Sequence, residues 1–438
     1  MAEWLRRTWE PNHGAGTRAG RRGGAFLAYL PDPLASRPVV LDSAASSRVA
    51  EVESRVRTLT AGPETRVLEG LSRFLLRSEA IASSRIEGIQ ASAQQIALAE
   101  LAQTDAPQVR GFTRDAQFVA NNIAALRRAT TDLAHAPGIT VESIDELHRA
   151  LLPDERHHGT RVVQNWIGGN HWHPIEADFV PPPPEHVPEL MIDFVGYLNG
   201  ALHSPLVQAA LAHAQFETIH PYPDGNGRVG RALIHTVLTR RGLTPSAVLP
   251  VSLVLLTRSD DYLAGLTSYR HVGPATGADG GQGFAGWLTT FLDATDLAVG
   301  QVAKFAAELA ELRDDWRDRL LEHRHRQGTP RAPRADSSLS RLLDHLPEAP
   351  LVTARTVQRM LDVSFPAAKN AAEALADAGI LTRESVERGT TGYFARDVFD
   401  LLTFADRRLA STRWDTRKSP PARPVPARPP RPEGQVLP

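Results

Sequence analysis

Apolar residues recur at intervals of three and four along most of this chain, which is the spacing of one buried helix face. The pattern predicts helices within residues 44–101, 108–152, 206–219, 228–238, 249–256, 262–269, 284–292 and 297–324. A glycine-rich stretch, 273–283, predicts a break before the last two of these. The chain is therefore expected to be mainly α.

Three segments interrupt the helical pattern. Residues 1–45 are rich in Gly, Arg and Pro around one apolar patch, Phe26–Pro31, and are expected to form an extended arm on the helical body. Residues 159–170 indicate a strand that enters a glycine turn, and a second extended piece ends in Phe179–Pro184. These two pieces predict a small β-hairpin, with a plain surface loop as the alternative.

The C-terminal part has a different texture. A Pro-, Arg- and Gly-rich linker spans 326–335, and three short helical patterns, a strand and a turn follow it within 336–405. This order resembles a winged helix-turn-helix domain. Its third helix offers Lys369 and Asn370 but also Glu373 and Asp377, so a protein contact is favoured over DNA, which is only weakly supported. Residues 411–438 alternate Pro and Arg and are expected to be disordered.

Composition narrows the class of protein. At 438 residues the chain is expected to hold two or three domains, and a net charge of -1 argues against a general polyanion binder. The absence of cysteine excludes disulfides, thiolate metal sites and cysteine nucleophiles. No apolar run is long enough to cross a membrane, and no secretory signal is visible at the start. A cytoplasmic protein is expected.

One stretch, His220–Arg231, carries more chemistry than a helix connection requires. Prolines end the preceding helix and stiffen the turn, and its glycines permit backbone angles that side chains forbid. A new helix begins near Arg228, and its free first-turn amides favour an anion such as a phosphate. Arg228 and Arg231 can hold further phosphate oxygens, Asp224 suits a magnesium ion, and His220 suits a proton acceptor.

This stretch resembles the signature loop of the Fic family, His-x-Phe-x-Asp/Glu-Gly-Asn-Gly-Arg-x-x-Arg, and departs from it only at Tyr222. The resemblance implies a Fic-type helical bundle in which His220 is the general base and Asp224 a Mg²⁺ ligand. It also implies that AMP passes from ATP to a Ser, Thr or Tyr hydroxyl of a target protein. The implied nucleotide-binding residues are Gly225, Asn226, Gly227, Arg228, Gly230 and Arg231. The hairpin of residues 159–184 resembles the family's flap, which holds the target segment.

A second motif lies at Ser83–Gly88. Ser83 and Glu87 are one helical turn apart, and Gly88 ends the helix behind them. Alone this pattern is also typical of an ordinary surface turn. Beside the loop it is similar to the inhibitory motif of Fic proteins, Ser/Thr-x-x-x-Glu-Gly/Asn. The resemblance implies that Glu87 pairs with Arg231 and takes the place of the last phosphate of the nucleotide.

Several alternatives stay open at this point. Tyr262 either faces the adenine or belongs to the core, and the histidines at 157, 158, 171 and 173 are read as loop residues instead of zinc ligands. A DNA-binding regulator with a nucleotide-sensing Fic body, or removal of AMP by the same site, competes with the transferase. A homodimer is compatible with the sequence. The expected domains are an arm (1–45), an N-terminal helical region with the inhibitory motif (46–135), a Fic core (136–325), a winged-helix-like domain (336–405) and a tail (411–438).

Overall fold

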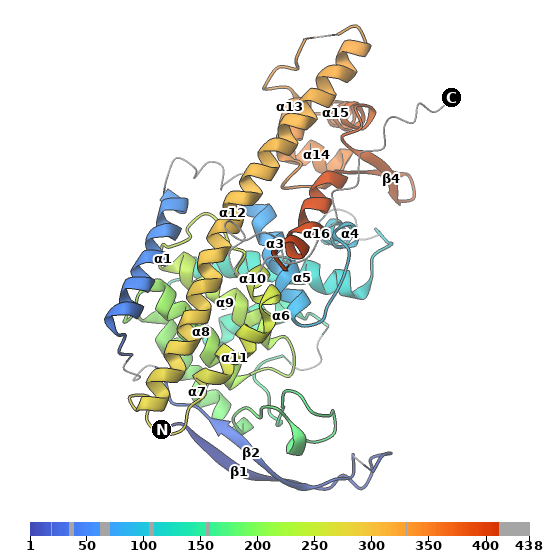
Figure 1. The fold of residues 1–438 in the computed structure, drawn as a ribbon. Coiled ribbons are helices and arrows are strands. Elements are labelled where there is room, and N and C mark those ends of the chain that lie inside the picture. The colour runs from blue at the N-terminus through green and yellow to red at the C-terminus, as the bar shows by residue number, and fades with distance from the viewer. Residues whose placement is uncertain are drawn as a thin grey trace.

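Two consecutive helices form the centre of the protein. The computed structural model describes residues 1–18, 20–34, 39–61, 71–104, 109–154, 158–329 and 331–410. All 15 residues of α8 (Pro205–Ile219) and 14 of the 15 residues of α9 (Asn226–Arg240) are buried. The two helices pack against each other in the middle of the bundle (Figure 1). The loop that joins them is thereby held on both sides.

The other helices of the body surround this pair. They are α1 (Ser43–Ala61), α3 (Ser72–Ile86), α4 (Ala93–Thr104), α5 (Arg114–Arg128), α6 (Val141–Leu151), α7 (Val187–Asn199), α10 (Val251–Thr257) and α11 (Ser259–Tyr269). A π-helical turn, Ala129–Leu133, continues α5. The prediction of a mainly helical protein is confirmed, although the predicted helical positions Val67 and Leu68 lie outside the described residues.

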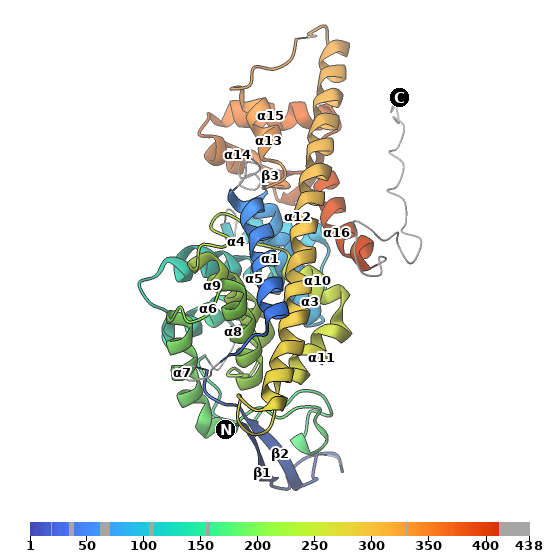
Figure 2. The same cartoon turned by 60° about the vertical axis from the view of Figure 1, so that its left-hand side comes forward.

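A single helix, α12 (Ala278–Arg326), runs the length of the molecule. Figure 2 shows it passing from the N-terminal end of the body to the C-terminal domain. The predicted glycine break is wrong for residues 278–283, which lie inside this helix. A Cβ at Gly283 would lie 2.1 Å from the carbonyl oxygen of Ser268 at the end of α11. The glycine therefore permits a close approach of two helices instead of interrupting one.

The N-terminal arm contains a two-stranded sheet that the sequence analysis missed. Strands β1 (Glu3–Trp9) and β2 (Gly24–Leu30) pair antiparallel, with Glu3 opposite Leu30 and Trp9 opposite Gly24. The Tyr29 amide then donates to the carbonyl oxygen of Val180 (2.9 Å), so the sheet supports the second side of the predicted flap. The arm is thus held by the pairing of β1 with β2 and by the hydrogen bond to Val180.

The predicted flap is less regular than expected. Its two sides meet in one isolated antiparallel bridge, Ile167 with Phe179, and no regular strand forms across 158–186. Gly168 and Gly169 both have positive φ, which ends the pairing on one side of the bridge. On the other side, residues 181–184 are all proline and have no amide hydrogen to donate. The two predicted strands are therefore reduced to a hairpin-like turn.

The C-terminal part follows the order helix, strand, helix, helix, hairpin. Its elements are α13 (Ser338–His345), β3 (Leu351–Thr353), α14 (Ala354–Leu361), α15 (Phe365–Asp377), β4 (Thr382–Glu387) and β5 (Thr390–Phe394). The sheet order is β3-β5-β4, both pairs antiparallel. The three helices and the final hairpin follow the predicted order, but β3 was not predicted, and 379–381, predicted as a strand, precede β4. The winged-helix assignment stays a prediction. The domain boundaries stay predictions.

A last helix, α16 (Arg396–Ala410), returns toward the body (Figure 1). The indole nitrogen of buried Trp316 on α12 donates to Oδ2 of Asp397 (2.9 Å), and Arg319 contacts the same oxygen at 2.6 Å. These bonds fix the start of α16 against α12. The predicted disordered tail lies outside the described residues. None of the described helices is both long and apolar enough to span a bilayer.

Replacing Trp287 with Ala should lower the free energy of unfolding by about 3–5 kcal/mol, because a fully buried aromatic ring would leave a cavity. Its indole nitrogen would also stop donating to the carbonyl oxygen of Ala210 (2.8 Å). Urea unfolding followed by circular dichroism measures the change. Leu321→Ala, at a half-exposed position of the same helix, should change stability by less than about 1 kcal/mol. Equal losses in the two variants would contradict this account of the core.

Candidate active site

The loop between α8 and α9 has an unusual backbone at its first residue. His220 follows the last turn of α8 with φ 49° and ψ 59°, in the left-handed region that residues other than glycine rarely adopt. Its amide still donates to the carbonyl oxygen of Phe216 (2.9 Å). The surrounding contacts must therefore hold this conformation against its local cost.

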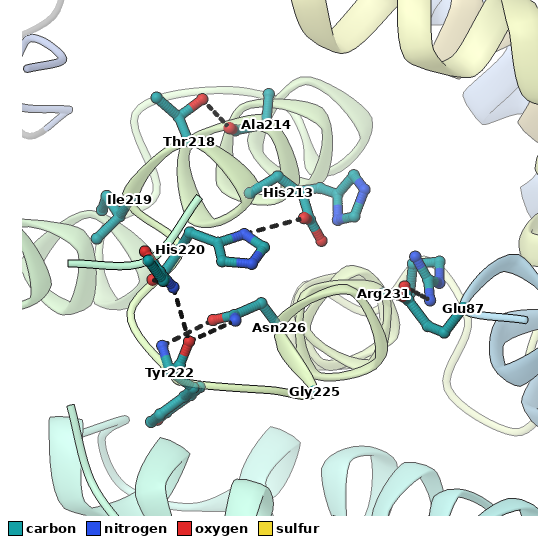
Figure 3. Close-up of polar contacts among 12 residues, drawn as sticks. Glu87, His213, Ala214, Thr218, Ile219, His220, Tyr222, Gly225, Asn226 and Arg231 are labelled. Carbon is teal, nitrogen blue, oxygen red and sulfur yellow. Dashed lines mark hydrogen bonds and ion pairs between the residues drawn. The ribbon is translucent and has the colours of Figure 1, made fainter. Parts of the chain in front are cut away.

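Asn226 closes the loop from the opposite end. Its Oδ1 accepts from the amide of Tyr222 (2.8 Å), and its Nδ2 donates to the carbonyl oxygen of Tyr222 (2.7 Å). Figure 3 shows this carboxamide facing the Tyr222 backbone. Gly225, with φ 80°, provides the turn into α9. Because the Asn226 carboxamide is engaged by the Tyr222 backbone through both Oδ1 and Nδ2, its backbone amide is the better placed group for a phosphate contact.

Arg161 is a loop residue that the sequence analysis missed. Its Nε donates to the carbonyl oxygen of His220 (2.9 Å) and its Nη2 to that of Pro182 (2.6 Å). Its amide also donates to the carbonyl oxygen of Pro221 (2.8 Å). The side chain is 2% exposed, and burial lowers its pKa to about 10. Arg161 therefore ties the flap segment to the loop and places a cation at the carbonyl end of α8.

The His220 imidazole is suited to accept a proton. Burial, together with the nearby charge of Arg161, lowers its pKa to about 4. The ring is therefore neutral at pH 7, with a free lone pair. Its Nδ1 lies 3.9 Å from Oε2 of Glu217, one turn earlier on α8. A neutral imidazole at the mouth of an anion site can take a hydroxyl proton.

Glu217 is a second residue that the sequence did not single out. Burial raises its pKa to about 7, although the charge of Arg231 opposes this. Its Oε1 is buried and has no hydrogen-bond partner among the described residues. No sequence pattern marks Glu217, because its importance comes from its proximity to His220 and Arg231 in the folded chain.

Arg228 is a buried cation with most of its donors unused. The residue is 2% exposed, and its Nε and Nη1 find no partner among the described residues. Its Nη2 is 3.7 Å from Oδ2 of Asp224, beyond hydrogen-bond distance. Burial lowers the pKa of Arg228. With the first-turn amides of α9 beside it, this guanidinium forms a site for an anion.

Arg231, in contrast, is fully paired with the inhibitory motif. Its Nη2 donates to Oε1 of Glu87 (2.7 Å) and to the carbonyl oxygen of Ser83 (2.8 Å), and its Nε donates to Oγ of Ser83 (2.9 Å). Figure 3 shows Glu87 and Arg231 in contact. Burial alone would lower the pKa of Arg231 and raise that of Glu87, but their mutual attraction outweighs burial in both. The pair that the resemblance implied is present.

The Glu87 carboxylate stands over the first turn of α9. A Cβ at Gly227 would lie 2.0 Å from its Oε1, so a side chain here would displace the carboxylate from this position. Glu87 is held there by the end of α3, where Gly88 has φ 77° and the amide of Ile89 donates to the carbonyl oxygen of Ser84 (3.1 Å). An anionic group of the protein therefore occupies the helix terminus at which a phosphate would bind.

Asp224 projects from the loop toward solvent, with a side chain 67% exposed. Its Oδ1 accepts from the amide of Gly225 (2.6 Å), and its carbonyl oxygen contacts Nε2 of His148 at 2.9 Å. The described residues contain no cluster of three or more His, Cys, Asp or Glu side chains that could hold a metal. A single exposed carboxylate fits a magnesium ion that takes its remaining ligands from phosphate and water.

Tyr222 stabilises the loop through the hydroxyl that distinguishes it from Phe. This hydroxyl donates to Oδ1 of Asp145 (2.7 Å) on α6. The ring of His148, one turn further along α6, stacks on Tyr222 with centroids 4.0 Å apart. Because His148 also contacts the Asp224 carbonyl oxygen, α6 holds the loop at two points. The substitution at this signature position adds a hydrogen bond and keeps the aromatic anchor.

Two predicted nucleotide-binding residues lie in the core. A Cβ at Gly230 would lie 2.9 Å from Oε1 of Glu217 and 3.1 Å from Phe216, so this glycine allows α8 and α9 to pack closely. Tyr262 is 4% exposed, and its hydroxyl lies 2.7 Å from Nε2 of His213. Both placements favour a structural role. Among the suspected loop histidines, His157 lies outside the described residues.

The sequence matches two family profiles in the places where these motifs lie. Residues 138–238, which include the loop, match the Fic/DOC family, and residues 42–131, which include Ser83–Gly88, match the Fic/DOC family N-terminal region. In these two regions the chain is similar to proteins of the Fic/DOC family. This confirms the resemblance on which the sequence analysis relied.

Curated proteins that resemble this chain match it over part of its length. The protein adenylyltransferase fic-1 of Caenorhabditis briggsae is 34% identical over 130 residues, 28% of this chain and 23% of the relative. A probable protein adenylyltransferase of Aquifex aeolicus is 46% identical over 68 residues, 15% of this chain and 21% of the relative. The chain thus spans less than a quarter of the length of these curated relatives. A Fic family protein from Desulfovibrio desulfuricans aligns with a TM-score of 0.48 at 21% identity, covering 82% of this chain and 98% of that chain.

Glu217→Gln should stabilise this protein at alkaline pH. Because folding raises the pKa of Glu217 from 4.5 to about 7, the unfolded chain loses this proton first, and the stability of the native protein falls between those two values. The variant avoids that loss, which by the pKa difference is at most on the order of 3 kcal/mol. Thermal unfolding of both proteins at pH 5 and pH 8 measures the gap. A gap that is equal or larger at pH 5 would contradict the raised pKa.

Proposed function

We propose that this protein transfers AMP from ATP to a Ser, Thr or Tyr hydroxyl of a target protein. One observation carries the proposal: the same loop holds two buried side chains with atoms that lack a hydrogen-bond partner among the described residues. These are the neutral His220 at the end of α8 and the guanidinium of Arg228 at the start of α9. A protein that only binds nucleotide needs the cation but not the base. The names of the curated relatives, protein adenylyltransferases, support the same reaction class.

In the proposed reaction His220 accepts the proton of the target hydroxyl, whose oxygen attacks the α-phosphorus of ATP. The bond from that phosphorus to the bridging oxygen breaks, and pyrophosphate leaves. Arg228 and the first-turn amides of α9 hold the negative charge on the phosphate oxygens. A magnesium ion held by Asp224 would supply additional charge neutralisation at the phosphates. Arg161 keeps the histidine backbone in place through its carbonyl oxygen.

The described state is the inhibited one in this proposal. Glu87 takes up the hydrogen-bonding capacity of Arg231, which the last phosphate of ATP would otherwise use, and lies against the glycine of the first helical turn. Two negative groups cannot share that space without a large electrostatic cost. ATP therefore binds productively only after the end of α3 moves.

The C-terminal domain gives no support to a DNA-binding role. Arg383, beside the third helix, is neutralised by Glu373 and Asp377 on that helix. A groove-reading surface needs unpaired cations and neutral hydrogen-bonding groups. A contact with protein is the better fit for this domain.

Glu87→Gly should raise transfer of label from α-labelled ATP to the protein or its target by at least about tenfold, which corresponds to ~1.4 kcal/mol. The reason is that Arg231 becomes free for the terminal phosphate. Glu87→Gln, which keeps the size but not the charge, should give an intermediate rate. Gel autoradiography with Mg²⁺ present measures both. A Glu87→Gly protein no more active than the parent, with His220 intact, would refute the inhibitory role.

In the Glu87→Gly background, His220→Ala should reduce label transfer by about 10²-fold or more, the usual contribution of a general base. Binding of ATP, measured by calorimetry, should change little, because Arg228 and the α9 amides remain. His171→Ala, at an exposed loop histidine, is the matched control and should keep full activity. Undiminished label transfer in His220→Ala would contradict the proposed mechanism. Loss of label from an already modified target protein would show instead that the site removes AMP.

A further inference from the structure

The predicted flap, residues 159–184, is held together by little pairing of its own. In its one described bridge the Ile167 amide donates to the carbonyl oxygen of Phe179 (2.9 Å), and the Phe179 amide donates to that of Ile167 (3.2 Å). Even a complete two-stranded hairpin is only marginally stable in water. Contacts with the helical body must therefore keep the flap in its place beside the loop of His220.

One of these contacts is an arginine that lies over the Phe179 ring. Arg270 directly follows α11, and its Cζ is 3.4 Å from the centroid of that ring. A cation at the face of an aromatic ring is attracted by the negative charge of that face. Phe179 is 4% exposed and also contacts Trp4 and Tyr29 of the N-terminal sheet, with ring centroids 6.4 and 6.2 Å apart. The residue that forms the bridge of the flap is therefore also the one that the guanidinium contacts.

The backbone that carries Arg270 is fixed on both sides. Before it, the Tyr269 hydroxyl donates to Oε1 of Gln215 on α8 (2.8 Å). After it, the His271 amide donates to the Tyr29 hydroxyl (3.0 Å), and this hydroxyl donates to the carbonyl oxygen of His271 (2.7 Å). The guanidinium thus reaches the flap from a segment that is tied both to the central helix and to the N-terminal sheet.

A cation is an unfavourable group with which to cover a buried aromatic ring. Burial lowers the pKa of Arg270 to about 10, although the charge of Glu217 opposes this. Its Nε is buried without a hydrogen-bond partner among the described residues, and an apolar side chain would cover Phe179 without that cost. After burial and the charge of Arg161, the charge of Arg270 also lowers the pKa of His220. The guanidinium therefore lies within electrostatic range of the proposed base while it contacts the flap.

We infer that Arg270 is a positioning residue, which holds the flap beside His220 through its contact with Phe179. Arg161 holds the flap from within, by donating to the carbonyl oxygens of His220 and Pro182, and Arg270 holds it from the helical body. In the proposed function the target segment lies along the flap, so the place of the flap sets the distance from the target hydroxyl to the imidazole. The effect on the reaction rests on that proposed function, whereas the contact with the flap does not.

Hydrogen exchange measures whether Arg270 holds the flap. Arg270→Met keeps an unbranched side chain but loses the charge, so the Ile167 and Phe179 amides should exchange about two- to thirtyfold faster, the range expected for one cation–π contact. Arg270→Lys keeps a charge that binds an aromatic face and should give intermediate rates. Arg114→Met is the matched control, because it removes a cation–π contact with Phe118 (5.1 Å) outside the flap and should leave these amides unchanged.

Equal exchange rates in Arg270→Met and the parent, or equal acceleration by Arg114→Met, would overturn the inference. Faster exchange in Arg270→Lys than in Arg270→Met would do the same, because methionine is the better replacement for a residue that only fills apolar space. Circular dichroism checks that all three variants are folded.

Label transfer shows whether the place of the flap matters to the reaction. In the Glu87→Gly background, Arg270→Met should lower transfer from α-labelled ATP by at least about twofold. Arg270→Lys should lower it less, and Arg114→Met should not lower it. ATP binding, measured by calorimetry, should stay unchanged in Arg270→Met, because Arg228 and the α9 amides remain to hold the nucleotide.

Unchanged transfer in Arg270→Met, or weakened binding of ATP, would each contradict the positioning role. If the Glu87→Gly protein itself transfers no label, the proposed function is wrong, and the exchange rates of the flap amides still decide whether Arg270 holds the flap.

Discussion

The burial of polar and charged side chains on α9 is the constraint around which this protein is built. Arg228, Arg231 and His235 lie on a helix that is enclosed by other helices along nearly its whole length. A buried charge is costly unless another group compensates it. His235 is compensated by Glu79 of α3, at 2.8 Å, and Arg231 by Glu87 and Ser83 of the same helix. Arg228 has no equivalent partner among the described residues, and that deficit marks the place where an anionic substrate belongs.

The same constraint explains why α3 contributes both to the core and to the candidate active site. Two of its glutamates bind two side chains of α9, His235 deep in the core and Arg231 at the candidate site. The core pair holds the middle of α3 in place, and the Glu87 pair depends on the last turn only. The terminal glutamate can therefore be displaced while the remainder of the helix stays packed. In the proposed mechanism, this displacement of Glu87 makes room for the last phosphate of ATP.

The sequence predicted the parts of the site that depend on local spacing. His220, Arg228, Arg231 and the Glu87 motif follow from short patterns, and helical periodicity located the bundle. Contacts with backbone carbonyl oxygens leave no such pattern, which is why Arg161 was missed. The pairing of β1 with β2 was missed because no turn signature lies between the two segments. The glycines at the start of α12 were interpreted as a helix break because the sequence does not show that they pack closely against α11. Gly230 and Tyr262 were assigned to the nucleotide for the same reason, since only the folded chain shows that they face the core.

The uninterrupted course of α12 has a mechanical consequence. A helix of 49 residues is a rod of about 74 Å, and such rods bend only gently unless a proline or a defect interrupts them. Its N-terminal half lies against α11 and α8, and its C-terminal half carries Trp316 and Arg319, which grip α16. A displacement of the C-terminal domain is therefore expected to tilt α12 as a whole and to move the helices that pack against its N-terminal half.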